Sequence, residues 1–350
     1  MKPDIRSLTR ADLADLCREF GWEQYRGRQL YTWLWQKQVT GFAAMTNISI
    51  ARREELARRF RLFIPETIAR REGPDGTARF TFRLEDGAVV ESVYIPDRDR
   101  RTACLSTQVG CALGCRFCRT ARLGFTRDLG WHEIAGQALE VARVVPDRLT
   151  NIVLMGMGEP LANYEATVTA VAELNAPAGL NIGARRITVS TAGLPAAIRR
   201  FARFPLQVRL AVSLNAADDE TRDRLMPVNR RHPLASVIAA VREFIEVRNK
   251  RVTFEYVLLR GINDRDEDAR RLAALLRGLS CKVNLILFNP FPGAEGAGAQ
   301  GETFAPPEPA TAERFAQLLY PLLPAVTIRR SRGGEIGGAC GQLAADADSC

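Results

Sequence analysis

The stretch Cys111-Ala112-Leu113-Gly114-Cys115-Arg116-Phe117-Cys118 holds three of the chain's 8 cysteines, at offsets of four and three residues. Thiolates this close in sequence can converge on one centre, and soft sulfur ligands favour iron–sulfur clusters or zinc. Three is an informative number, because a structural zinc site or an electron-transfer cluster usually takes four protein ligands. A [4Fe–4S] cluster held by three cysteines leaves one iron open to bind another molecule. We therefore expect a reactive cluster here rather than a chance grouping of buried cysteines, which are usually scattered.

The composition is typical of a globular protein: 350 residues, 46% hydrophobic and 25% charged. The start, Met1-Lys2-Pro3, has no apolar run that would serve as a signal peptide, and no segment has the roughly 18 apolar residues of a transmembrane helix. We expect no membrane association and a cytoplasmic, reducing location, where cysteines act as ligands or catalysts rather than as disulfide links. The net charge of +9 suits a polyanionic partner such as nucleic acid, with ordinary solvated charged faces as the alternative.

Residues 1–72 are predicted to form a small helical, basic domain. They hold 14 Lys and Arg against 9 Asp and Glu, so much of the chain's excess charge lies in its first fifth. Thr9 and Asp12 suggest a capping box at the start of one helix, and an aromatic stripe within residues 26–35 suggests the packed face of another. We interpret the domain as an RNA-binding module. Its candidate contacts are Arg26, Arg28, Lys37, Arg52, Arg53, Arg58 and Arg59.

Residues 73–100 are predicted to be a β-hairpin linker that carries Glu91. The turn Gly73-Pro74-Asp75-Gly76 marks its beginning. Two alternating runs, 78–84 and 89–95, then flank Asp86-Gly87, which is a hairpin signal. A further strand at 102–106 would lead the chain into the cysteine stretch.

Residues 101–330 alternate between strand-like and helix-like patterns, which predicts parallel βα units closed into a (β/α) barrel or partial barrel. Residues 293–309 are rich in Gly, Ala and Pro and are predicted to be a flexible loop. Residues 331–350 form a Gly-rich tail that carries Cys340 and is predicted to be mobile. The expected strands cover 151–155, 186–189, 208–213, 252–258, 283–287 and 326–329, and the expected helices cover 131–144, 164–174, 194–201, 234–247, 267–276 and 312–323.

Polar or flexible residues stand where several of these strands end. In a barrel such positions face one ligand site, although each could equally serve as a helix cap or a turn. The candidates are Gly158, Glu159, Ser190, Ser213, Leu214, Asn215 and Asn289.

Taken together, these motifs resemble the RlmN/Cfr family of radical S-adenosylmethionine (SAM) RNA methyltransferases. The spacing C-x3-C-x2-C matches the radical SAM signature, and the matches run in order along nearly the whole chain. They comprise Val90 to Pro96, Cys104 to Cys118, Gly124-Phe125, Gly156 to Pro160, Ser190-Thr191, Ser213 to Ala216, Asn284 to Gly293, Arg332-Gly333 and Ala339 to Leu343. The resemblance implies an α/β fold, a radical SAM (β/α) partial barrel with a small N-terminal helical accessory domain.

The resemblance also implies an activity, methylation of carbon 2 of adenosine. The implied substrates are 23S rRNA at the peptidyl-transferase centre and tRNA next to the anticodon. The implied cofactors are a [4Fe–4S] cluster on Cys111, Cys115 and Cys118 and two SAM molecules per turnover, with the strand-end residues as SAM contacts. A flavodoxin- or ferredoxin-type protein would donate electrons, and we expect a monomer.

Three further residues take chemical roles through the resemblance. Cys340 would accept a methyl group from one SAM by nucleophilic attack. The methyl carbon would then be joined to the adenine ring, and Glu91 would remove the ring proton. Cys104 would attack the sulfur of Cys340 to release the protein–RNA crosslink, leaving a transient disulfide. Without the resemblance, Glu91 would pass for a solvent-facing strand residue and Cys104 for core packing.

The chain also departs from the family pattern. Asn215 stands where many members have His, and Asn cannot titrate near neutral pH, so a proton-transfer role there is not expected. The loop 293–309 is longer than usual. Gln108-Val109-Gly110 favours the RlmN branch over the Cfr branch, and hence carbon 2 over carbon 8.

Three alternatives stay open at this point. They are a Cfr-like carbon-8 methyltransferase, a non-catalytic iron–sulfur RNA-binding protein and, with least support, a zinc protein. Cys17, Cys281 and Cys350 are interpreted as structural or incidental, and neither His132 nor His232 is expected to be a ligand.

Overall fold

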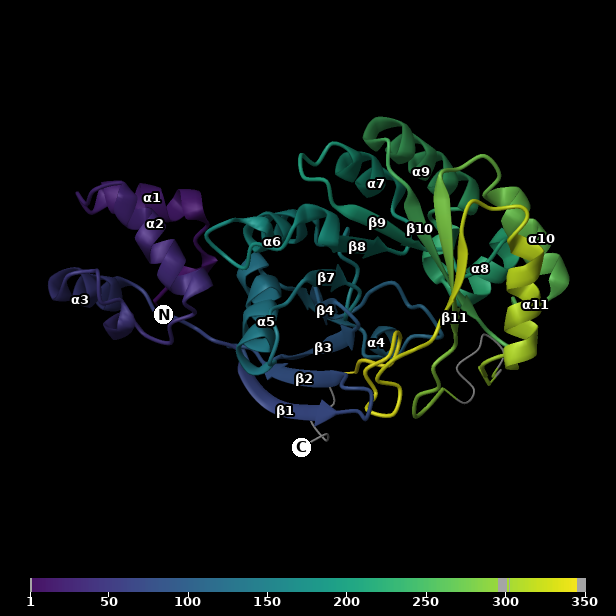
Figure 1. Cartoon of the computed structure of the whole chain (residues 1–350), viewed down its shortest axis with the longest axis horizontal. Helices are drawn as coiled ribbons and strands as arrows, with labels where there is room; N and C mark the ends of the chain where they lie inside the picture. The colour runs from purple at the N-terminus through teal and green to yellow at the C-terminus, as the bar shows by residue number, and fades with distance from the viewer. Residues whose placement is uncertain (1, 295–300, 302, 345–350) are drawn as a thin grey trace.

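A computed structural model describes residues 2–294, 301 and 303–344 of the chain. Figure 1 shows a group of N-terminal helices beside a strongly curved sheet, with the C-terminal tail crossing the open end of the curve. The sheet has ten strands in the order β1-β2-β3-β4-β7-β8-β9-β10-β11-β12, and β5 and β6 form a separate pair. Because β1 and β12 are the two edges of the described sheet and do not pair, the architecture is a partial barrel.

The N-terminal helices form as the sequence predicts, up to residue 59. Thr9 and Asp12 make the capping box of α1 (Arg10–Glu19), with a 2.8 Å bond from the Thr9 N–H to the Asp12 carboxylate. The helix α2 (Tyr25–Tyr31) continues as a π-helical turn, Thr32–Gln36, and α3 spans Ile50–Arg59. Trp35 stacks on Trp131 of the barrel helix α5, 5.1 Å between ring centres, so the aromatic stripe packs the domain against the core as expected.

The prediction that the helical region extends to residue 72 is wrong at its end. Glu66–Glu72 form strand β1, which pairs antiparallel with β2 (Ala78–Arg83). Its charged sequence suits a helix in isolation, but the open edge of the hairpin provides backbone partners that override local propensity. The predicted hairpin itself is confirmed, since β2 pairs antiparallel with β3 (Val89–Asp97) and β3 with β4 (Arg100–Cys104).

The alternating βα pattern is confirmed from β4 onward, where every pairing of neighbouring strands in the main sheet is parallel. In Figure 1 the longer helices lie along the outer face of this curved sheet. The strands are β7 (Asn151–Leu154), β8 (Ile187–Thr191), β9 (Arg209–Ser213), β10 (Val252–Leu258), β11 (Cys281–Leu287) and β12 (Val326–Arg329). The helices are α5 (Trp131–Val144), α6 (Tyr164–Asn175), α7 (Pro195–Ala202), α8 (Asp219–Leu225), α9 (Leu234–Arg248), α10 (Asp266–Leu275) and α11 (Pro309–Leu319). Single 3-10 turns cover Ile5–Ser7, Phe42–Ala44, Ala184–Arg186 and Pro227–Arg230.

The cysteine stretch is enclosed by elements that the sequence did not reveal. A two-stranded ribbon, β5 (Gln108–Gly110) and β6 (Phe125–Asp128), joins its two ends, and α4 (Arg119–Arg122) follows the last cysteine. Gly110 has φ +76°, and a Cβ there would lie 1.9 Å from the carbonyl oxygen of Gly124. Only glycine fits this close approach, which brings the Cys111 N–H within 2.7 Å of the same oxygen.

The described part of the C-terminal tail is not the loose segment that its glycines predicted. Arg332 donates to the Pro96 carbonyl at 2.6 Å and to Asp97 at 2.8 Å, and Thr120 donates to the Leu343 carbonyl at 2.6 Å. Residues 345–350, with Cys350, lie outside the described residues, as do 295–300 and 302 of the predicted flexible loop. None of the helices that the structure describes is long and apolar enough to cross a membrane.

Candidate active site

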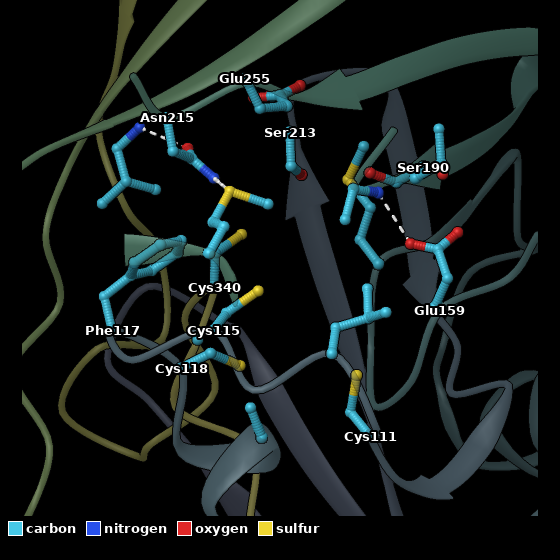
Figure 2. A pocket seen from close by; sticks show the side chains of 18 of the residues that line it. Cys111, Cys115, Phe117, Cys118, Glu159, Ser190, Ser213, Asn215, Glu255 and Cys340 are labelled. Carbon is cyan, nitrogen blue, oxygen red and sulfur yellow. Dashed lines mark hydrogen bonds between the residues drawn. The ribbon is translucent and has the colours of Figure 1, made fainter. Parts of the chain in front are cut away.

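A cavity of about 160 Å³ lies where strands β7 to β11 end, closed on one side by the cysteine loop and the tail. Figure 2 shows the side chains that line it. Most of the residues that the sequence singles out meet here, although they come from segments far apart in the chain. The predicted residues in its lining are Cys111, Cys115, Cys118, Gly158, Glu159, Ser190, Ser213, Asn215 and Cys340.

The three cysteines share this cavity but do not form a ready-made site for one ion. Figure 2 shows Cys111 on the side of Glu159, apart from Cys115 and Cys118, which lie near Cys340. Within the described residues, no group of three or more His, Cys, Asp or Glu side chains is placed to hold a single metal ion.

The donor set nevertheless fits a multi-iron cluster, whose cysteine ligands need not gather around one atom. Burial raises the pKa of Cys111 to about 12 and raises the pKa of both Cys115 and Cys118. Thiolates are therefore costly at this place unless iron, or another cation, is bound beside them. Three thiols on one loop, facing a cavity with further polar residues, match a cluster with one open iron.

The Gly158-Glu159 turn after β7 is held rigidly. Gly158 has φ +98°, and a Cβ there would lie 2.5 Å from the Cβ of Gln108, so the turn can close only around glycine. The Glu159 carboxylate accepts the N–H of Ala192 at 2.7 Å and that of Leu161 at 2.9 Å (Figure 2 shows the first). Burial raises the pKa of Glu159 to about 7. Each of its oxygens keeps a lone pair that can accept from an ammonium group.

Asn215 has a structural reason to be asparagine. Its φ of +59° is left-handed, a conformation that Asn tolerates better than most residues. Its amide oxygen accepts the Val257 N–H at 2.9 Å, and its amide nitrogen lies 3.3 Å from the sulfur of Met226. The side chain thus braces the β9–β10 edge of the cavity, and no titrating group is present at this position.

Two predicted contacts lie outside the cavity lining. Leu214 is fully buried in the main core between Ser213 and Asn215, which do line the cavity, so its side chain points the other way. Asn289 donates its amide hydrogen to the Cys340 carbonyl at 3.1 Å and therefore holds the tail. As SAM contacts, both remain predictions.

A second cavity, of about 100 Å³, adjoins the first and brings the two other predicted cysteines together. Cys104, at the end of β4, and Cys340, in the tail, both line it as free thiols. Burial raises the pKa of Cys104 to about 12, and the charge of Cys340 adds to this shift. Cys118, Arg329 and Cys340 line both cavities.

Glu91 lines neither cavity. Its side chain is fully buried between β2 and the tail, so it is not the solvent-facing residue that strand alternation alone suggests. One carboxylate oxygen lies 3.3 Å from the Arg79 guanidinium, and the other accepts the Ala344 N–H at 2.9 Å.

Three charged residues at the site escaped the sequence reasoning. Glu255 and Arg329 line the first cavity, and the neighbouring Cys340 raises the pKa of Arg329. Arg222 is fully buried and donates to the carbonyls of Ala192 at 2.5 Å and Leu214 at 3.0 Å. Glu255 could have been recognised from the sequence, because it is a charged residue inside the otherwise apolar strand 252–258. Nothing in the sequence of helix α8 indicated that Arg222 would lie at the site.

Comparison with known proteins identifies the family to which this chain belongs. Residues 105–273 match the model of the radical SAM superfamily, and residues 4–62 match that of the ribosomal RNA large subunit methyltransferase N-terminal domain. The dual-specificity RNA methyltransferase RlmN of Anaeromyxobacter dehalogenans is 46% identical, over 98% of this chain and 92% of its own length. That of Desulfosudis oleivorans is 45% identical, over 98% of this chain and 91% of its own.

A solved structure agrees with these relatives. The crystal structure of a radical SAM methyltransferase from Sphaerobacter thermophilus is 44% identical and superimposes with a TM-score of 0.92. The match covers 98% of this chain and 100% of that one. The chain therefore belongs to the RlmN family of radical SAM RNA methyltransferases, which work with a [4Fe–4S] cluster and SAM.

Proposed function

We propose that this protein methylates carbon 2 of adenosine in 23S rRNA, at the peptidyl-transferase centre, and in tRNA next to the anticodon. The main support is one juxtaposition: Cys340 lines the same cavity as the three cysteines of the cluster motif. A methyl group on its sulfur would lie beside the place where a SAM-derived radical forms. Carbon 2 is electron-poor because it lies between two ring nitrogens, so a direct polar attack on the methyl of SAM is unfavourable.

Each residue has a defined part in this proposal. Cys111, Cys115 and Cys118 would hold the cluster, and Gly158, Glu159, Ser190, Ser213 and Asn215 would bind SAM around it. With both bound, the cofactors would supply the one-electron chemistry that removes a hydrogen atom from the methyl group on Cys340. The Cys340 sulfur gains that methyl in an earlier displacement on another SAM, in which the thiol proton leaves to solvent and the carbon–sulfur bond of SAM breaks.

Product release then depends on Cys104. Once the methyl carbon is bonded to the adenine, the adduct would give up its unpaired electron to the oxidised form of the electron-transfer protein and its ring proton to Glu91, and Cys104 would then attack the Cys340 sulfur. The bond between that sulfur and the methylene carbon would break with its electron pair going to the carbon, which takes up a proton to become the product methyl group. A disulfide would form between the two cysteines, and an external thiol reductant would restore both. The shared second cavity supports this pairing, because both cysteines line it.

The remaining assignments concern partners and organisation. We assign RNA binding to the basic helical domain that precedes β1, the barrel core to 101–330, with the hairpin strands before it, and the tail to 331–350. The N-terminal family match at 4–62 agrees with an accessory domain that ends before β1. A flavodoxin- or ferredoxin-type protein would supply electrons to a monomeric enzyme in the cytoplasm.

The test is nucleoside mass spectrometry of RNA from a strain that lacks the gene. Loss of 2-methyladenosine from 23S rRNA and tRNA, restored by the gene in trans, is the expected result. Unchanged 2-methyladenosine would overturn the proposal, and loss of 8-methyladenosine instead would support the carbon-8 alternative. Absence of SAM cleavage by the reduced, cluster-loaded protein would favour a non-catalytic RNA-binding role. The similarity to RlmN relatives along the chain favours carbon 2.

A further inference from the structure

The tail that carries Cys340 is fastened to the hairpin by a buried carboxylate. Glu91 on β3 accepts the backbone N–H of Ala344 at 2.9 Å, across 253 positions of sequence. Glu91 is 0% exposed and Ala344 is 2% exposed, so water does not compete for this hydrogen bond. We propose that Glu91 is a positioning residue, a latch that holds the Cys340 tail in place in the RNA-free enzyme.

The latch is built into the hairpin independently of the tail. Arg79 on β2 lies 3.3 Å from one Glu91 oxygen, and Thr81, directly opposite Glu91 in the β2–β3 register, donates to that same oxygen at 3.5 Å. Arg79 is only 4% exposed, so this ion pair lies inside the protein. The other oxygen is left for the tail. A hydrogen bond from an N–H to a buried, charged acceptor is stronger than one between neutral groups.

Other contacts hold the tail from different directions. The Asn289 amide donates to the Cys340 carbonyl, the Arg119 N–H donates to the Gly341 carbonyl at 2.8 Å, and the Gln342 side chain donates to the Pro290 carbonyl at 2.7 Å. All of these use neutral groups. For residues 339–344, Glu91 is the charged acceptor among the described hydrogen-bond partners, so its loss should loosen the end of the tail most.

This arrangement gives the same carboxylate two incompatible tasks. Naming Cys340 as the methyl carrier and Glu91 as the base for carbon 2 rests on the proposed function; the latch itself does not. While Ala344 and Arg79 engage Glu91, the carboxylate faces neither cavity and cannot reach a ring proton. The tail must leave Glu91 before the base can act, and RNA that enters over the tail would cause this release.

Hydrogen–deuterium exchange of the full-length, cluster-loaded protein without RNA tests the latch, read by mass spectrometry on the peptide that spans 338–344. Glu91→Ala removes the acceptor, and Ala344→Pro removes the donor while leaving the Glu91–Arg79 pair intact. Both variants should exchange on the order of tenfold faster there, with a peptide from helix α9 unchanged. The matched variants keep part or all of the hydrogen bond: Glu91→Gln, which keeps an acceptor oxygen but loses its charge, should exchange at a rate between those of the parent and Glu91→Ala, and Ala344→Gly, which keeps the N–H, should exchange within about twofold of the parent.

The outcomes separate the latch from the methylation chemistry. Parent-like exchange in Ala344→Pro, or equal acceleration in all four variants, would overturn the latch, even if Glu91→Ala did not fold. Glu91→Gln should protect the tail better than Glu91→Ala does, yet fail to methylate RNA if Glu91 is also the base. A protected tail with full activity in Glu91→Gln would remove the base role from the proposed function and leave the latch standing.

Discussion

The two adjoining cavities share Cys118, Arg329 and Cys340 but are assembled in different ways. The first is built largely from turns that follow successive parallel strands, so the order of the chain places its residues around one opening. The second joins Cys104 on β4 to a tail that returns from the far end of the chain. The first therefore depends on local turns and strand ends, whereas the second depends on a few long-range contacts that fasten the tail.

The sharpest test of this division compares Cys115, which lines only the first cavity, with Cys340, which lines both. Cys115→Ala removes a cluster ligand and should abolish bound iron, SAM cleavage and methylation together. Cys340→Ala should keep the iron and its visible absorption but lower methylation on the order of a thousandfold or more, because the nucleophile is missing. Iron analysis and nucleoside mass spectrometry measure both effects. Loss of iron in Cys340→Ala would show that the two cavities are not separable.

The second cavity alone is tested by Cys104→Ala. Methyl transfer and addition to adenine should proceed, but the crosslink should not be resolved, so a covalent protein–RNA adduct should accumulate during a single turnover. Denaturing gel electrophoresis with labelled RNA detects the adduct. Cys281→Ala, a buried cysteine in neither cavity, is the matched control and should turn over without adduct. Normal turnover by Cys104→Ala would remove Cys104 from this role.

Within the first cavity, Gly158→Ala should weaken SAM binding by about tenfold or more. The new Cβ would lie 2.5 Å from the Gln108 side chain at a φ of +98°, so the Gly158-Glu159 turn has to move. Gly87→Ala is the control, since Gly87 has φ +83° with no atom within 4 Å of its added Cβ, and it should cost only about 1 kcal/mol of stability. Anaerobic calorimetry measures SAM affinity. Equal affinity in both variants would mean that the turn does not shape the SAM site.

The last test concerns a pH dependence of stability, rather than of activity, that arises in the first cavity. Burial raises the pKa of Glu159 from 4.5 to about 7, so the folded state favours its neutral form. This contribution is fully present below about pH 4.5 and is lost as the pH rises through 7, a change of roughly 3 kcal/mol. In the metal-free protein, Glu159→Gln should remove this loss of unfolding free energy with rising pH. Urea unfolding of both proteins at pH 5 and pH 8 measures it, and identical slopes would contradict the prediction.

Several features of the site were readable because they depend on neighbours in sequence. The spacing of Cys111, Cys115 and Cys118 needs only one loop, and the strand-end positions of Ser190 and Ser213 follow from the βα alternation. Strand β1 was missed because its partner is supplied by tertiary structure, while its own charged residues favour a helix. Arg222 was missed because no helix was expected over 219–225, and only packing shows that this arginine is buried among carbonyl groups.

The cluster motif, the parallel βα order and the family could be read from the sequence alone, because each is encoded in spacing or in ordered local motifs. The burial of Glu91, its hydrogen bond to Ala344 and the cavity shared by Cys104 and Cys340 became visible only in the folded molecule. The physical reason is the range of the contacts. The periodicity of apolar residues and the spacing of cysteines can be read along the chain. A hydrogen bond between Glu91 and Ala344, 253 positions apart, exists only once the fold has brought these two residues together.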